Sequence, residues 1–439
     1  MKKSVIVLIL LAVMVIIISP GLIGKLAEER VSENLNWAAE ESGELVVTSV
    51  GFDRGWFSSE GQHRIEVGEG TLRETLSSGS DPMLDERLPA LLIDTRIDHG
   101  IVPLTSLTRD KGSLAPGLGR AVSTLSIESG DGETWTIPGT IYSEIGLGGQ
   151  LVSTYELPAG SHTVEGAYFA WEDGKLEVNG GPTTGDISFD GDFGTISVDD
   201  GNAPWSIEGM AFDGSMKATP HGFYVGDMDF EMKSLTVSQN GMSIQALNGA
   251  TLAGESSLDD GRVNGSFRLE ADGKTSPVFG DAFFIAEMSF TGLEAAAWGE
   301  VTRKLDAQPA TALPADVMAA AENDLMDLVA AGFEIDVSQF DVGTPMGTIT
   351  STMNLSVPEA DRDNFAWSSL LLSLNGELNL SVPEMLVQFA SSMDPEAGAL
   401  IGMGYLVKDG DAYTMDAKIA KGLLTVNGAP MPLPVGMFD

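Results

Sequence analysis

The sequence contains no cysteine among its 439 residues. Disulfide bonds, cysteine-ligated metal sites and thiol nucleophiles are therefore excluded together. Histidine is also scarce: the chain has four, and none stands in an HExxH or comparable spacing. There is no GxSxG elbow, no SxxK arrangement, no Walker loop and no GxGxxG between a strand and a helix. The local sequence therefore predicts no catalytic residues, no metal ligands and no cofactor.

Basic residues are few, with 24 Lys and Arg against 64 Asp and Glu, which gives a formal net charge of −40. A field of this sign repels DNA, RNA and anionic lipid headgroups, so we predict no nucleic-acid partner. The acidic residues are scattered through turns and alternating segments rather than gathered in one tail. Because scattered acidic residues favour solvation in a salty environment, this pattern indicates a halophilic source.

The N-terminus has no charged residue between Lys3 and Lys25. A helix needs about 20 apolar residues to cross a bilayer, and residues 4–24 provide them. The lysines before this stretch favour an N-terminus in the cytoplasm, with the rest of the chain outside. A cleaved signal peptide is the alternative, but a proline and a glycine stand where its small residues would be expected. We predict an uncleaved anchor at residues 1–24 that contacts the lipid bilayer.

After the anchor, the hydrophobic pattern is first helical and then alternating. Residues 25–44 have apolar residues spread over successive turns, which predicts a juxtamembrane helix. In "DMDFEMK" (227–233) and "SFRLEAD" (266–272), apolar and polar side chains alternate with a period of two. This alternation indicates strands with one apolar face and one wet face. Frequent Asn-Gly and Asp-Gly pairs between such segments predict antiparallel hairpins that follow one another along the chain.

Helices are expected mainly late in the chain. Residues 313–332 have an apolar stripe and a terminal glycine, and another helix is expected to begin at Pro383. A further helix is predicted over residues 82–93, and none between residues 120 and 290. In "LLLSLNGELNLSV" (370–382), the leucines share one parity, so we predict a hairpin with a three-residue loop and Gly376 at a positive φ.

These patterns predict a mainly β protein with some α structure. We expect a long, curved, antiparallel meander with a few packed helices, which would bury its apolar face either by curling or by covering it with the helices. The predicted organisation is an anchor at 1–24, a helix at 25–44, a β-rich body at 45–312, and a helix-plus-β part of the same body at 313–439. Its exposed sheet edges favour self-association to a dimer.

The stretch "VGFDRGWFSSEG" (50–61) places Arg54, Trp56 and Phe57 together, followed by two serines. Neither serine has a base nearby in the sequence or an evident oxyanion loop, so a nucleophile is disfavoured. We interpret the stretch as an anchoring first strand in which Trp56 packs under neighbouring strands. The alternative is a contact with a ligand or partner, in which Arg54 would stack on an aromatic ring or pair with a carboxylate.

An N-terminal anchor, a short helix and this stretch together resemble the YdgA family of bacterial envelope proteins of unknown function. "AAGFEIDVSQFDVGTPMGTITSTMNLSV" (330–357) is similar to the family's helix-then-strands passage, and "AKGLLTVNGAPMPLP" (420–434) is similar to its closing strand and turn. The resemblance implies an inner-membrane anchor with a periplasmic body, and it brings no catalytic residues.

Two classes of function remain open. The first is a non-enzymatic envelope factor that serves as a scaffold for an envelope protein or binds a lipid or other hydrophobic ligand. Strand faces rich in Met and Leu motivate the ligand hypothesis, since flexible apolar side chains can accept acyl chains, although the same faces could simply form a closed core. The second class is a periplasmic hydrolase whose site is assembled from distant Ser, His and Asp residues.

Overall fold

The computed structural model describes residues 45–55, 57–68, 90–99, 117–128, 132–164, 167–180, 185–199, 201, 204–239, 242–276, 280–306, 314–365, 370, 372–393 and 395–431. The anchor predicted at 1–24, the helix predicted at 25–44 and most of the helix predicted at 82–93 lie outside these residues. Within these ranges, no helix is long and apolar enough to cross a bilayer.

The described residues are mainly in strands, as the alternating pattern predicted. They form 23 strands, and each pairing that has a defined register is antiparallel. Contacts between residues divide the chain into two compact units, which exchange short segments along the sequence.

The first unit is a meander of eight antiparallel strands. Each strand pairs with the next in the order β1 (Leu45–Arg54), β2 (Ser58–Val67), β3 (Ala90–His99), β4 (Gly119–Glu128), β5 (Thr134–Ile145), β6 (Leu151–Leu157), β9 (Gly174–Gly180) and β10 (Ile187–Phe193). A short strand, β7 (Gly160–Val164), follows β6 in the chain, and all of it except Gly160 belongs to the second unit.

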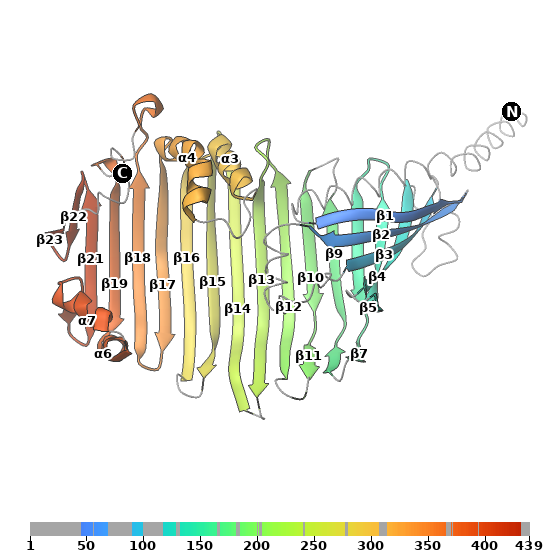
Figure 1. Ribbon diagram of the computed structural model, residues 1–439, viewed down its shortest axis with the longest axis horizontal. Helices are drawn as coiled ribbons and strands as arrows, with labels where there is room; N and C mark the ends of the chain where they lie inside the picture. Colours follow the sequence, from blue (N-terminus) through green and yellow to red (C-terminus); the bar gives the residue numbers. More distant parts are fainter. Residues whose placement is uncertain are drawn as a thin grey trace, which may run out of the picture. The chain divides into compact units, whose positions relative to one another are not determined.

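The second unit contains the longest strands, which lie side by side as long arrows in Figure 1. The paired order is β8 (Ala167–Trp171), β11 (Ile196–Asp199), β12 (Trp205–Ala218), β13 (Tyr224–Gln239), β14 (Met242–Asp259), β15 (Arg262–Ser276), β16 (Gly280–Glu294), β17 (Phe333–Thr344), β18 (Gly347–Val357), β19 (Asn375–Pro383), β21 (Ala412–Ala420), β22 (Leu423–Val426) and β23 (Ala429–Met431). A further strand, β20 (Val407–Asp409), also pairs with β21.

The helices of the second unit come in two pairs, α3 (Ala295–Asp306) with α4 (Pro314–Ala330), and α6 (Glu384–Met393) with α7 (Pro395–Gly402). A 3-10 turn, η2 (Arg362–Asn364), lies near α4. The helices predicted over 313–332 and from Pro383 are confirmed as α4 and α6. Helix α3 was not predicted.

A buried core forms where α3 and α4 pack on the end of the sheet. Val263, Leu293, Ala295, Ala297 and Leu328 are each less than 9 % exposed, and six partly buried side chains, Trp298 among them, pack around them. Burying a Val or Leu side chain contributes about 1.5–3 kcal/mol, so this cluster accounts for much of the attachment of the helices.

Arg262 links α4 to the sheet through backbone carbonyls. Its Nη1 donates to the carbonyl oxygen of Gly292 at 2.9 Å and to that of Ala331 at 3.0 Å. The guanidinium therefore pairs with a carbonyl just beyond the C-terminus of α4, where a positive charge is favourable. Gly332, with φ of 76°, takes the left-handed conformation that ends the helix.

Two sequence predictions are wrong. Leu370 and Leu374 do not lie on the first strand of a leucine hairpin, because the amide of Leu374 donates to the carbonyl of Leu370 in a helical turn. Gly376 instead lies within β19, between Leu355 of β18 and Ile419 of β21, and it has no positive φ. Residues 90–93, expected to be helical, begin strand β3. Both errors concern the type of local structure, because a short apolar run fits a helical turn or a strand and its period alone does not decide between them.

Candidate functional site

One face of strands β12 to β19 is almost entirely apolar across the sheet. The pairing registers align a central row of side chains and two flanking rows along the hydrogen-bonding direction. The central row is Phe212, Phe230, Leu252, Leu269, Ala286, Phe340, Ser351 and Leu380. The flanking rows are Gly214, Met228, Gly254, Phe267, Met288, Val337, Met353 and Leu378, and Met210, Met232, Ala250, Ala271, Phe284, Val342 and Ile349. We call these three rows the apolar face.

The side chains of the apolar face are packed together but not covered as a core would be. All residues of the rows except the buried Gly214 are partly exposed, and Phe340 is 38 % exposed. The rings of Phe284 and Phe340 meet edge to face, with centroids 5.5 Å apart. Helices α3 and α4 cover the end of the sheet at Phe290 and Phe333. The rows beyond that end therefore present apolar surface that a hydrophobic ligand can contact.

The dimensions of the apolar face suit long, narrow ligands. Neighbouring strands lie about 4.8 Å apart, so eight strands extend over about 34 Å. Alternate residues along a strand are about 6.7 Å apart, so three rows are about 13 Å wide. The hydrocarbon core of a bilayer is about 30 Å thick, or about 15 Å for the chains of one leaflet. An extended acyl chain therefore fits on the face with room for others beside it.

The opposite face of the same strands is strongly acidic. Asp227, Asp229, Glu255, Glu287 and Asp336 line a hollow of about 450 Å³ around the guanidinium of Arg268. Their positions alternate with those of the apolar rows, so the carboxylates gather on the face opposite those rows, where Phe283 and Ile285 also lie. Water and salt solvate such a face well, whereas the apolar face gains by excluding water.

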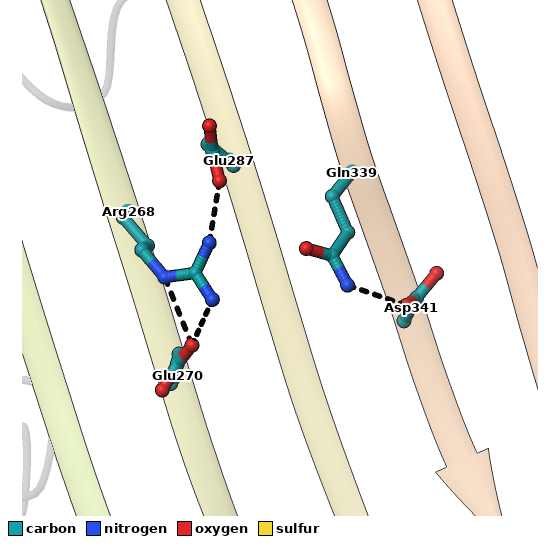
Figure 2. Close-up of polar contacts among 5 residues, drawn as sticks. All are labelled: Arg268, Glu270, Glu287, Gln339 and Asp341. Carbon is teal, nitrogen blue, oxygen red and sulfur yellow. Dashed lines mark hydrogen bonds and ion pairs between the residues drawn. The ribbon is translucent and has the colours of Figure 1, made fainter.

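The acidic face is ordered by side-chain pairs across and along the strands, as Figure 2 shows. Arg268 pairs with Glu270 on its own strand and with Glu287 on β16. Hydrogen bonds to Glu270 and to Glu287 raise the pKa of Arg268 above its usual value. Farther along the sheet, Nε2 of Gln339 donates to Asp341 at 2.7 Å. These pairs offset only part of the negative charge, because carboxylates outnumber Arg268 in the hollow.

The residues singled out in the sequence lie on the first unit. Arg54 ends β1, opposite Ser59 of β2, and Trp56 lies outside the described residues. Phe57 is 37 % exposed, and its carbonyl oxygen accepts a hydrogen bond from the amide of His99 at 3.1 Å. A role for Arg54, Trp56 and Phe57 as an anchor or partner contact therefore stays a prediction.

The first unit brings together one Ser–His pair that sequence analysis missed. Oγ of Ser59 lies 3.0 Å from Nε2 of His99, although the two residues are 40 positions apart in the chain. Both side chains are buried, at 2 % and 1 % exposure, and the nearby hydroxyls of Thr95 and Ser123 pair with each other at 2.8 Å. A nucleophile must contact its substrate, so this buried geometry favours a structural hydrogen bond. Only the strand pairing of β2 with β3 could have revealed it.

His63 belongs to the same buried face, between Ser49 of β1 and Ile93 of β3. Burial lowers its pKa below the ordinary value of 6.5, and its Nε2 has no hydrogen-bond partner among the described residues. The folded protein therefore holds the imidazole neutral, while the unfolded chain takes up a proton near pH 6.5.

Stability should consequently decrease as pH falls through 6.5, by at most about 1.4 kcal/mol per pH unit for this group. Urea unfolding at pH 7.5 and at pH near 5.5 measures the difference. His63→Gln should show a smaller loss on acidification than the unchanged protein, and His162→Gln, at an exposed position, should show the same loss. An equal loss for His63→Gln would contradict a neutral buried imidazole.

Within the described part of the chain, no group of three or more His, Asp or Glu side chains is placed to hold a metal ion. In the acidic turn after β11, a carboxylate stabilises the turn itself. Oδ1 of Asp199 accepts a hydrogen bond from the amide of Gly201 at 2.9 Å and so closes its own turn.

The fold and its faces define a protein built on long antiparallel sheets, with one apolar and one acidic face, and without a recognisable catalytic centre in the described residues. The chain belongs to the family described as bacterial protein of unknown function (DUF945), whose model matches residues 1–434. It is similar to Protein YdgA of Escherichia coli (strain K12), with 26 % identity over 243 residues. The match covers 52 % of this chain and 45 % of YdgA, less than half the length of that relative. No solved structure matches the chain.

Proposed function

We propose that this protein is a non-enzymatic envelope factor that binds the acyl chains of lipids on the apolar face. In this proposal, residues 4–24 anchor the chain in the inner membrane with the N-terminus in the cytoplasm, and the β-rich units lie in the periplasm. The single observation that supports it is the set of three uncharged rows, of which two are continuous over eight strands and one over seven, and whose side chains are partly exposed.

A lipid is favoured as the ligand because the apolar face provides a large apolar contact area and few side chains that can form hydrogen bonds. Burying apolar surface contributes about 25 cal/mol per Å², so even a few hundred Å² of contact yields several kcal/mol. The rows contain five methionines, whose unbranched side chains adapt to chains of different shape. A compact polar metabolite would find few hydrogen-bond partners on this face.

Native mass spectrometry of the full chain, extracted in a mild detergent, tests the proposal. The expected result is a series of adducts with the masses of membrane lipids, which persist through detergent exchange. Thin-layer chromatography of an organic extract should then identify the same lipids. A chain that carries no lipid above the level of a membrane protein purified in parallel would contradict the proposal, and a lipid-free dimer would indicate that a second copy covers the face.

A further inference from the structure

Helices α6 and α7 carry several exposed apolar side chains. Met385, Phe389 and Met393 of α6 are 61 %, 40 % and 73 % exposed. Their spacing of four residues places them on one side of the helix, so they form a continuous stripe. Leu400 of α7 and Met403 just beyond it are also exposed, at 41 % and 56 %. We call these five residues the hairpin stripe.

Helices α6 and α7, which we call the helical hairpin, are attached to the rest of the second unit by hydrogen bonds and by a buried side chain. The stripe therefore has a fixed position on the surface. Val387 on the other side of α6 is buried, and the amide of Glu384 donates to the carbonyl of Asp411 at 3.0 Å. At the far end, Nδ2 of Asn427 donates to the carbonyl oxygens of Gly404 at 2.9 Å and Tyr405 at 3.1 Å. Both ends of the hairpin are therefore tied to neighbouring backbone.

Few charges surround the stripe in the sequence: between Glu384 and Lys408, only Asp394 and Glu396 are charged. No charged residue occurs from Met385 to Met393 or from residue 397 to 407, although charged residues make up 20 % of the sequence. Glu384, at the start of α6, pairs with Lys408, and the two charges offset each other. Hydrogen bonds between them lower the pKa of Glu384 and raise that of Lys408, so the pair stays ionised near neutral pH.

The stripe is also joined to the proposed lipid site. Helix α6 follows β19 directly and packs on β19 and β21 (Figure 1). Leu378 and Leu380 of β19 belong to the rows of the apolar face, and Leu380 pairs with Met415 of β21. The hairpin therefore follows directly on β19, the last strand of the apolar face.

We infer that the hairpin stripe dips into the surface of a bilayer of zwitterionic lipid, where acyl chains pass between the bilayer and the apolar face. This inference rests on the proposed lipid-binding function. Amphipathic helices of this kind lie with the apolar side about 5–10 Å deep at the boundary of headgroups and chains. The uncharged segment at residues 4–24 would keep the chain at a bilayer, and the net charge of −40 disfavours an anionic surface.

Because the chain has no cysteine, a single introduced cysteine can report on each position without background. Met385→Cys and Met393→Cys are labelled with an environment-sensitive fluorophore in the full chain, in phosphatidylcholine nanodiscs with or without acyl-brominated lipid. The expected result is a blue shift and about two-fold quenching by the brominated chains, as for a probe at the interface. Thr352→Cys, exposed on the acidic face of β18, is the control and should show neither change.

A label at Met393 that remains accessible to an aqueous quencher and unaffected by bromine overturns the inference. So does a label that is shielded without bromine quenching, because that result shows a second copy or another protein on the stripe. The two proposals fail separately. Lipid adducts without bromine quenching would remove the hairpin inference alone, and quenching without lipid adducts would remove the proposed function while leaving a membrane contact.

Discussion

Replacing Leu252 and Leu269 by glutamate is expected to abolish most lipid binding on the apolar face. Leu252 and Leu269 face each other on β14 and β15 in the middle of the central row. Placing a charged side chain in a hydrocarbon environment costs about 2.5–3.5 kcal/mol, and each 1.4 kcal/mol is a factor of ten in affinity. Leu252→Glu with Leu269→Glu should therefore reduce lipid occupancy by more than about tenfold.

The control for this variant lies one residue away. Thr251→Glu introduces the same charge at an exposed position on the acidic face, and it should leave lipid occupancy unchanged. Native mass spectrometry of the variants at equal concentration measures occupancy, and circular dichroism verifies that the strands are retained. If the double variant folds and still carries lipid at the original level, the ligand does not lie on the apolar face.

Truncating Leu328 is expected to destabilise the protein by weakening the packing of α4 on the sheet. Leu328 is 6 % exposed, and it is the residue of α4 that belongs to the buried cluster. A buried Leu-to-Ala substitution costs about 2–5 kcal/mol, because the lost transfer free energy adds to that of the cavity. Leu328→Ala should lower the free energy of unfolding by this amount, measured by urea denaturation with tryptophan fluorescence, since Trp298 packs on the cluster.

Glu322→Ala serves as the matched variant on the same helix. Glu322 is exposed, and its replacement should change stability by less than about 0.5 kcal/mol. A loss below about 1 kcal/mol for Leu328→Ala would show that α4 contributes little to the fold.

The sequence was sufficient to predict the faces of individual strands but not their neighbours. Residues 227–233 and 266–272 alternate as expected, and Met228, Phe230 and Phe267 fall on the apolar face. The polarity of each side chain is known from the sequence, so the apolar and polar faces of these strands can be predicted without a structure. Register depends on pairing across the sheet, which no single segment contains.

Strand β17 shows what a local pattern cannot supply. Val337 pairs with Met288 and Phe340 pairs with Ala286, so three residues on β17 correspond to two on β16. This bulge returns Phe340 to the apolar face, whereas strict alternation after Val337 would place it on the acidic face. The Ser59–His99 contact was missed for the same reason, since it arises only when β2 pairs with β3.

The apolar and acidic rows run across the strands, so the length of each row depends on how many hairpins the sheet contains. Inserting or deleting one hairpin would change the length of the apolar face by about 10 Å, which is two strand spacings, and would leave its width along the strands unchanged. The length of such a sheet can therefore change during evolution in steps of one hairpin, while the sequences of the existing strands stay the same.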